Sequence, residues 1–230
     1  MFNEENILKV YFDCETTSLL DDAKLISIGL ITDCNNIFYA ELNDYDYRLD
    51  TDPYNSFDKN DIAVDKWTYD NIIQKLIFKE FFADDTKCFD NTIQIYKAGS
   101  ENIALFLKEW LKHINTNNKI VCFYGDNICH TGKFLFRLLP KLSCLDMINM
   151  PIDLFTSFAL NDVYYWRDRY QYVWCHSLDS AKSYLDDVKI IHRMLNNNTE
   201  LDANKSIIDF KHNALYDALT IKHCFKCLLK

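Results

Sequence analysis

The chain has 230 residues, a size typical of one domain or of one core with a substantial insertion. Apolar residues make up 49% of it and charged residues 26%, a balance that excludes wholesale disorder. The 34 acidic side chains outnumber the 25 basic ones, and the resulting net charge of −9 excludes an overall basic field for gripping phosphates.

Three β-strands are expected near the N-terminus. Residues 7–12, 24–32 and 37–42 are short β-type runs, and residues 33–36 form a turn between the last two. Because the connections between them are short, these strands favour an antiparallel meander.

The next part of the chain is less regular. Residues 43–60 are rich in Asp, Tyr and Asn and predict a surface loop. The apolar spacing of residues 61–83 is typical of a helix. Residues 84–97 are ambiguous, and are compatible with a loop that holds a short strand at 92–96.

Helices and strands alternate in the middle of the chain. Residues 100–114 predict a helix that Ser100 caps. The expected apolar face of this helix consists of Leu105, Phe106, Trp110 and Leu111. A buried strand is expected at residues 119–124, followed by a helix at residues 131–139 that Pro140 ends.

The last third completes a mixed pattern. Residues 151–154 predict a strand that leads into a helix, and residues 177–185 predict a short helix. A polar loop is expected at residues 196–206 and a final helix at residues 213–229. This order of elements predicts the α/β class, with helices packed on a central sheet.

Membrane insertion and secretion are not expected. The apolar stretches are short and interrupted by charges, and the N-terminus lacks the positive start of a signal peptide. We therefore expect a cytoplasmic protein in which the nine cysteines are reduced thiols. Cys224 and Cys227 form a CxxC pair, but no second pair follows at zinc-finger spacing, so packing is the expected role of both.

The first motif with chemical potential lies at the end of the first expected strand. Asp13 and Glu15 are two positions apart, so on a strand both carboxylates point to the same side. Two carboxylates held this close repel each other unless a cation lies between them, and such oxygen ligands suit Mg²⁺ or Mn²⁺. A polar strand end that meets solvent is the alternative interpretation.

The second motif lies at the start of the last expected helix. His212 stands just outside the first turn and Asp217 within it. Histidine is the side chain that most readily accepts a proton near neutral pH, so a histidine on the loop before a helix can serve a reaction centre. The alternative is a histidine in the capping region together with a surface aspartate.

Together, in this order, the two motifs resemble those of the DEDDh 3′–5′ exonucleases, which include proofreading exonucleases, oligoribonuclease and ribonuclease T. Residues 10–17 are similar to the apolar strand and Asp-x-Glu-Thr of that family, although Ser18 stands where glycine is usual. Residues 212–218 match its His-x-Ala-x-x-Asp-Ala motif. The resemblance implies a single ribonuclease H-like domain over residues 1–230, with an antiparallel meander plus parallel strands, and an insertion at about 43–97.

The resemblance also implies a fourth carboxylate from the middle of the chain. Residues 121–137 are similar to the corresponding oligoribonuclease segment, but Thr131 stands at the position of the catalytic aspartate. Either Asp126, five residues earlier, supplies the missing carboxylate, or the site has lost a ligand. His130 and Lys133 lie close by in the sequence, where they can contact a substrate phosphate or simply face solvent.

The function implied by the resemblance is a metal-dependent 3′–5′ exonuclease that releases 5′-mononucleotides from single-stranded RNA or DNA. In this interpretation His212 takes a proton from the attacking water, and two Mg²⁺ or Mn²⁺ ions clamp the scissile phosphate. The implied metal ligands are Asp13, Glu15, Asp126 and Asp217. The residues expected to line the pocket of the terminal nucleotide are Thr16, Thr17 and Leu19.

Two other functions remain open at this point. One is a non-catalytic protein on the same fold that binds nucleic acid or another protein, for which Thr131 is the distinguishing feature. The other is a proofreading unit associated with a polymerase or a helicase. A homodimer is compatible with the resemblance, and no membrane partner is expected.

Overall fold

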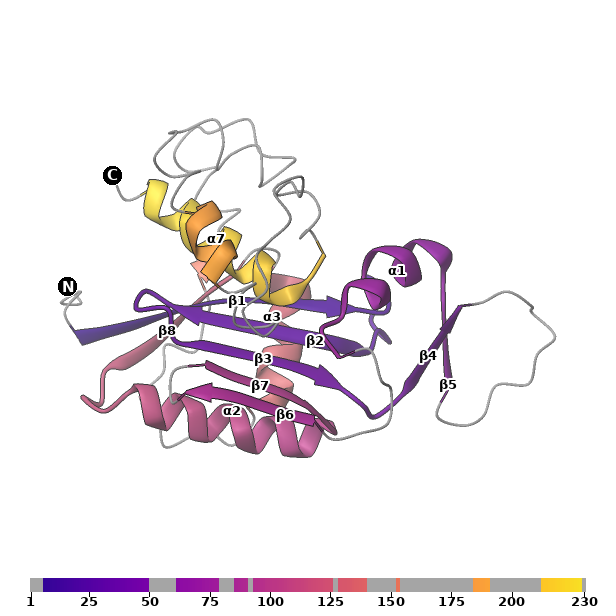
Figure 1. Ribbon diagram of the computed structural model, residues 1–230, viewed down its shortest axis with the longest axis horizontal. Helices are drawn as coiled ribbons and strands as arrows, with labels where there is room; N and C mark the ends of the chain where they lie inside the picture. Colours follow the sequence, from indigo (N-terminus) through magenta and orange to yellow (C-terminus); the bar gives the residue numbers. More distant parts are fainter. Residues whose placement is uncertain are drawn as a thin grey trace.

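The computed structural model describes residues 6–49, 61–78, 85–90, 93–125, 128–139, 152–153, 184–190 and 212–228. Within these residues one mixed sheet has the strand order β6-β7-β3-β2-β1-β8-β9 (Figure 1). Its strands are β1 (Ile7–Thr16), β2 (Leu25–Thr32), β3 (Ile37–Leu42), β6 (Asp85–Asp90), β7 (Ile93–Ala98), β8 (Ile120–Gly125) and β9 (Ile152–Asp153). β2 pairs antiparallel with both β1 and β3, whereas β8 runs parallel to β1 and β7 runs parallel to β3.

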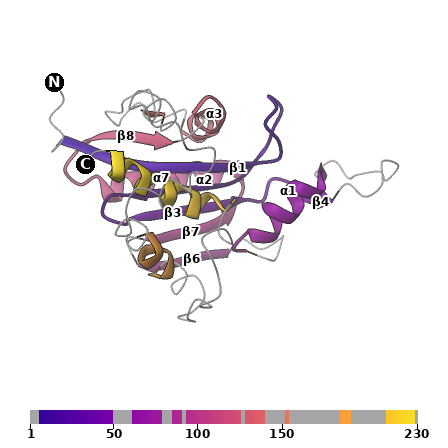
Figure 2. The same cartoon turned by 90° about the horizontal axis from the view of Figure 1, so that it is seen from above.

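Helices cover both faces of the sheet. On one face lie α7 (Ala214–Leu228) and a helix over residues 184–190, and on the other lie α2 (Ser100–Ile114) and α3 (Ile128–Leu138) (Figure 1 and Figure 2). Each face has its own apolar core, because successive side chains of a strand point to opposite sides. In β1, for example, Tyr11 packs under α7 whereas Phe12 packs against α2 and α3. The predicted α/β class, with helices on a central mixed sheet, is therefore confirmed.

The start of α7 packs directly on β2. A Cβ atom at Gly29 would lie 2.4 Å from the Ala214 carbonyl O, which is far inside van der Waals contact, so this approach requires glycine. Because β2 is the neighbour of β1 in the sheet, the same contact holds the first turn of α7 beside the end of β1.

A smaller unit packs beside β2. β4 (Asp46–Leu49) and β5 (Asp61–Val64) form a parallel pair, followed by the short helix α1 (Lys66–Asn71) and the single 3₁₀ turn η2 (Ile73–Lys75). A third apolar core fixes this unit to β2, and its buried members are Ile26, Tyr47, Val64, Ile72 and Ile73.

This unit corrects two of the sequence predictions. The expected loop at residues 43–60 contains β4, and the expected helix at residues 61–83 begins with a strand and continues as two short helical turns. The apolar spacing was misleading because β5 gains its partner from β4, a pairing that local periodicity does not reveal. The ambiguous range of residues 84–97 contains two strands, β6 at 85–90 and β7 at 93–98, of which β7 matches the short strand expected at 92–96, and both join the main sheet.

The prediction for α2 is right in extent and wrong in detail. The N-cap is Gly99, not Ser100, and the Ser100 N–H donates to both carboxylate oxygens of Asp44 at 2.9 and 3.1 Å. An acid 56 positions away therefore satisfies the helix start, which a local capping rule cannot anticipate. Leu105 is exposed rather than on the apolar face, and the buried positions are Ile103, Leu107, Trp110 and Leu111.

The other expected elements agree with the structure or fall outside it. The three N-terminal strands, the strand after α2 and the last helix are confirmed, with β1 extending four residues beyond the expected end at Phe12. Residues 152–153 form the expected strand, whereas residues 177–183 and 196–206 lie outside the described residues, as does Asp126. Among the described helices, none has the length and apolar character needed to cross a bilayer.

Candidate functional site

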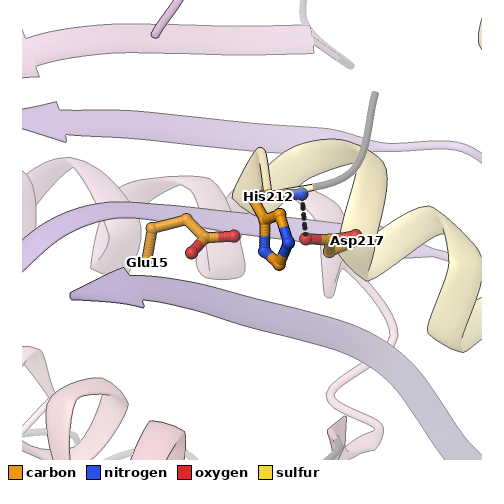
Figure 3. A group of neighbouring side chains, drawn as sticks. All are labelled: Glu15, His212 and Asp217. Atoms are coloured by element: carbon orange, nitrogen blue, oxygen red, sulfur yellow. Dashed lines mark hydrogen bonds between the residues drawn. The ribbon is translucent and has the colours of Figure 1, made fainter. Parts of the chain in front are cut away.

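The two ends of the chain meet at one place on the sheet. Glu15 in β1, His212 just before α7 and Asp217 in the first turn of α7 each offer a ligand atom, and these atoms lie within 4.8 Å of one another (Figure 3). Glu15 is separated from the other two by about two hundred positions in the sequence, and the packing of α7 across β1 and β2 brings them together. The structure thus joins three of the residues that the two motifs single out.

Because side chains alternate along β1, Asp13 and Glu15 lie on the face of the sheet that α7 covers. Asp13 and Glu15 have the same parity as Tyr11, which packs under α7, so their side chains leave the same face of the sheet. The register between β1 and β2 shifts between Glu15 and Thr16, and irregularities of this kind commonly re-aim side chains next to functional sites. Both acids are nearly inaccessible, with 4% of Asp13 and 7% of Glu15 exposed.

His212 is held by its backbone as well as by its ring. Its φ of 64° lies in the left-handed region, which is uncommon for a residue with a side chain. Its N–H donates to Asp217 Oδ2 at 3.0 Å. Asp217 therefore contributes an acid to the site and also fixes the turn that carries the histidine. Asp217 itself is fully buried.

The short helix α1 supplies the neighbour of the imidazole. The indole of Trp67 meets the ring of His212 edge to face, with 4.9 Å between ring centroids. Asp65 caps α1 through a bond from the Thr68 N–H, and this bond lowers the pKa of its carboxyl. Sequence reasoning missed Trp67, because this residue lies in a range that was expected to be one long helix with no part in the site.

Asn213 ties this same unit to α7. Its side-chain Oδ1 accepts from the Leu215 N–H at 3.1 Å, and its Nδ2 donates to the Lys75 carbonyl O at 3.0 Å. The first bond stabilises the start of α7 and the second anchors the end of η2. His212 is therefore tied to residues 66–75 in two ways, because its ring contacts Trp67 and the next residue, Asn213, bonds to Lys75.

A pocket of about 520 Å³ opens beside these groups. Its floor includes both acids of β1, and its rim carries large exposed apolar side chains: Leu19 and Leu20 from the turn after β1, and Trp67 from α1. The residues of the expected nucleotide pocket all line it, namely Thr16, Thr17 and Leu19. Its dimensions suit a ligand of nucleotide size.

The start of α3 also lines the pocket. Thr131 is buried there and lines the pocket, in the place where the resemblance implies a carboxylate. A threonine offers a neutral hydroxyl, which cannot supply negative charge to a cation. Asp126, the other candidate for the fourth carboxylate, lies outside the described residues.

His130 links α3 to the end of β1. Thr16 Oγ1 donates its single proton to the Ser18 carbonyl O at 2.8 Å, so it must accept from His130 Nε2, which lies 3.0 Å away. Burial, together with the nearby charge of Lys133, lowers the pKa of His130. The neutral ring therefore carries its proton on Nε2 and serves as a fixed donor to Thr16.

The donors at this site suit a divalent cation. Three acidic side chains are buried here, those of Asp13, Glu15 and Asp217, and a bound cation would stabilise their charged forms. Oxygen donors from carboxylates suit Mg²⁺ and Mn²⁺. Asp13 lines the same pocket as Glu15 but is not one of the group whose ligand atoms lie within 4.8 Å. The residues present can thus hold a metal ion, with Asp13 at the edge of the cluster.

Comparison with known proteins adds no family to this geometry. No protein-family model matches the chain, and no curated protein sequence is significantly similar to it.

Proposed function

We propose that this chain is a metal-dependent 3′–5′ exonuclease of ribonuclease H-like fold, which releases 5′-mononucleotides from single-stranded RNA or DNA. The observation that carries the proposal is the convergence of Glu15, His212 and Asp217 within 4.8 Å at a pocket that also contains Asp13. Two acids from a first strand and a histidine–aspartate pair from a last helix are the combination that the two motifs imply for this chemistry.

Each residue has a role that its position supports. Asp13, Glu15 and Asp217 would hold Mg²⁺ or Mn²⁺, ions that at such sites activate water and stabilise the leaving oxygen of a phosphodiester. His212, between the two acids that flank it in Figure 3, takes the proton that the attacking water gives up. Because the ions bring positive charge to the phosphate, the chain's net charge of −9 does not oppose binding at this point.

The rim of the pocket supports a single-stranded substrate. Leu19 and Trp67 are 78% and 54% exposed, and both line the pocket, so apolar surface is available at its mouth. Stacking or apolar contact with a splayed base stabilises single-strand binding without requiring a particular sequence. A base-paired end would have to separate before its last nucleotide entered a space of about 520 Å³.

A second candidate, a nucleic-acid-binding module without catalysis, is favoured by one observation. Thr131 occupies the pocket wall where a fourth carboxylate is implied, so the described part of the site has three acids rather than four. A site with fewer acidic ligands binds divalent ions less tightly and can retain the pocket while losing the reaction.

The experiment that separates these candidates follows the length of labelled strands. Single-stranded RNA and DNA carrying a 5′ label are incubated with Mg²⁺ or Mn²⁺ and with the parent, Glu15→Gln or Glu109→Gln. Glu109 is an exposed acid of α2 whose side chain pairs with Lys112, so it provides a matched control. An exonuclease shortens the strand from its 3′ end in the parent and the control, and Glu15→Gln slows the reaction by a factor on the order of 100 or more.

Two results oppose the proposal. If neither strand type is shortened with either ion, the enzyme is excluded, and retained strand binding in a mobility-shift assay then identifies the binding module. If Glu15→Gln cleaves as fast as the parent, any nuclease activity originates outside this site.

A further inference from the structure

The imidazole of His212 lies between the carboxylates of Glu15 and Asp217 (Figure 3). In Figure 3 Glu15 approaches the ring from the β1 side and Asp217 from the α7 side. The ligand atoms of all three residues lie within 4.8 Å of one another. His212, which also lines the pocket, thus contributes a ring nitrogen to a compact set of three potential ligands.

The chemistry of this set differs from that of a purely acidic site. Two carboxylate oxygens and one imidazole nitrogen are a donor combination that Zn²⁺ and related transition metals favour, whereas Mg²⁺ prefers oxygen ligands and retains its waters. Ligand atoms about 2.1 Å from one tetrahedral zinc ion lie about 3.4 Å apart. The three atoms lie within 4.8 Å of one another, so binding one ion requires the side chains to close by up to about 1.4 Å.

The three residues are also held in place before any ion arrives. The His212 N–H bonds to Asp217 Oδ2 at 3.0 Å, and the ring packs against Trp67. Glu15 is buried at the irregular end of β1. Ligands whose positions are fixed by packing and hydrogen bonds lose little freedom when they bind an ion, which favours affinity.

We propose that Glu15, His212 and Asp217 form a site for one Zn²⁺ ion, or for another divalent transition metal that prefers nitrogen, in which His212 is a ligand. One ring nitrogen cannot bind an ion and accept a proton with the same lone pair. Zn²⁺ bound in this way therefore blocks the proton acceptor and inhibits the Mg²⁺-supported reaction. The inhibition rests on the proposed function, whereas the ion site does not.

Zinc binding is tested without any measurement of cleavage. Isothermal titration calorimetry with Zn²⁺ and, separately, with Mg²⁺ compares the parent with His212→Gln and with His113→Gln. His113 is an exposed histidine of α2 and serves as the matched control. We expect His212→Gln to weaken Zn²⁺ binding at least tenfold while changing Mg²⁺ binding less than threefold, and we expect His113→Gln to change neither.

A spectroscopic measurement on the parent protein tests Zn²⁺ binding even if the His212→Gln variant does not fold. The chain has six histidines, and their ring nitrogens can be followed by NMR after ¹⁵N-histidine labelling. One equivalent of Zn²⁺ should shift the His212 ring signals, which the His212→Gln spectrum identifies, and Mg²⁺ in excess should not move them.

The outcomes distinguish this inference from the proposed function. If Zn²⁺ binds equally well to His212→Gln, or if the His212 signals stay in place at one equivalent, the ion lies elsewhere, for example on a thiol, and the inference is wrong. If the chain shows no exonuclease activity but His212 ligates Zn²⁺, the metal site stands and the proposed function fails.

Discussion

Glu41 is the buried acid whose protonation should govern the stability of the unit beside the site. Its side chain in β3 is 1% exposed, and its carboxylate accepts from the Tyr39 hydroxyl at 2.8 Å and from the backbone N–H groups of Ile77 and Phe78. Burial raises the pKa of Glu41 to about 7, although these hydrogen bonds and the charge of Lys97 act in the opposite direction.

The sign and size of the pH effect follow from this pKa. A carboxyl that titrates near 4.5 when unfolded and near 7 when folded binds its proton more tightly in the folded chain. Its contribution to stability is complete below about pH 4.5 and is lost as the pH rises through 7. At 1.36 kcal/mol for each unit of pKa, the loss is on the order of 3 kcal/mol.

Glu41→Gln removes this titration while keeping an oxygen that can accept from the backbone. Urea unfolding at pH 5, 6, 7 and 8 gives the free energy of unfolding of the parent, of Glu41→Gln and of the exposed control Glu109→Gln. The parent and the control should lose stability relative to Glu41→Gln between pH 5 and pH 8. Parallel pH profiles for the parent and Glu41→Gln would refute the reasoning, because they would show that Glu41 has the same pKa in both states.

Three further perturbations test the packing around the site. Gly29→Ala should destabilise the chain by roughly 1–3 kcal/mol or more in urea, because its Cβ would meet the Ala214 carbonyl O, and unchanged stability would mean that α7 does not approach β2 this closely. His130→Ala should lower the free energy of unfolding by about 1 kcal/mol, because it removes the bond to Thr16. His130→Gln keeps a donor and should lose less stability. Equal losses in the two variants would contradict the role of His130 as a donor. Burial lowers the pKa of Lys222 to about 8, so the folded chain loses this proton at a lower pH than the unfolded chain does. In urea unfolding the parent should therefore gain stability between pH 8 and pH 10, whereas Lys222→Met should not. The same gain in both proteins would show that Lys222 is not the group responsible.

The parts of the fold that the sequence predicts are those with a local signal. Alternation along β1 is enough to place Asp13 and Glu15 on one face, because a strand has no other way to orient them. The start of the last helix is likewise visible in residues 212–218. Neither pattern says how far apart the two motifs lie, and their meeting depends on a glycine in a third element, Gly29.

The parts that the sequence does not predict depend on partners far along the chain. Glu41 is the next-to-last residue of a mostly apolar strand and resembles a polar strand end, yet the backbone N–H groups of residues 77–78 bond to it. Asp44 satisfies the start of α2 from a segment that was expected to be a loop. Trp67 contacts His212 from α1, which follows β5, and β5 pairs with β4 rather than continuing as the expected helix.

These long-range contacts mean that His212 is positioned largely by residues outside the central sheet. The residue precedes α7, so its ring does not lie on a helix. Asp217 holds its backbone N–H, Trp67 contacts its ring, and the bond from Asn213 to Lys75 holds the next residue. The last two of these contacts come from residues 66–75 of the small unit beside the site. Residues 77–78, which follow that unit, bond to Glu41 in β3, whose pKa burial raises to about 7. The acids of β1 are part of the rigid sheet, whereas the histidine depends on a small unit with little core of its own. We therefore expect a change in that unit to alter the orientation of His212 more than that of the acids.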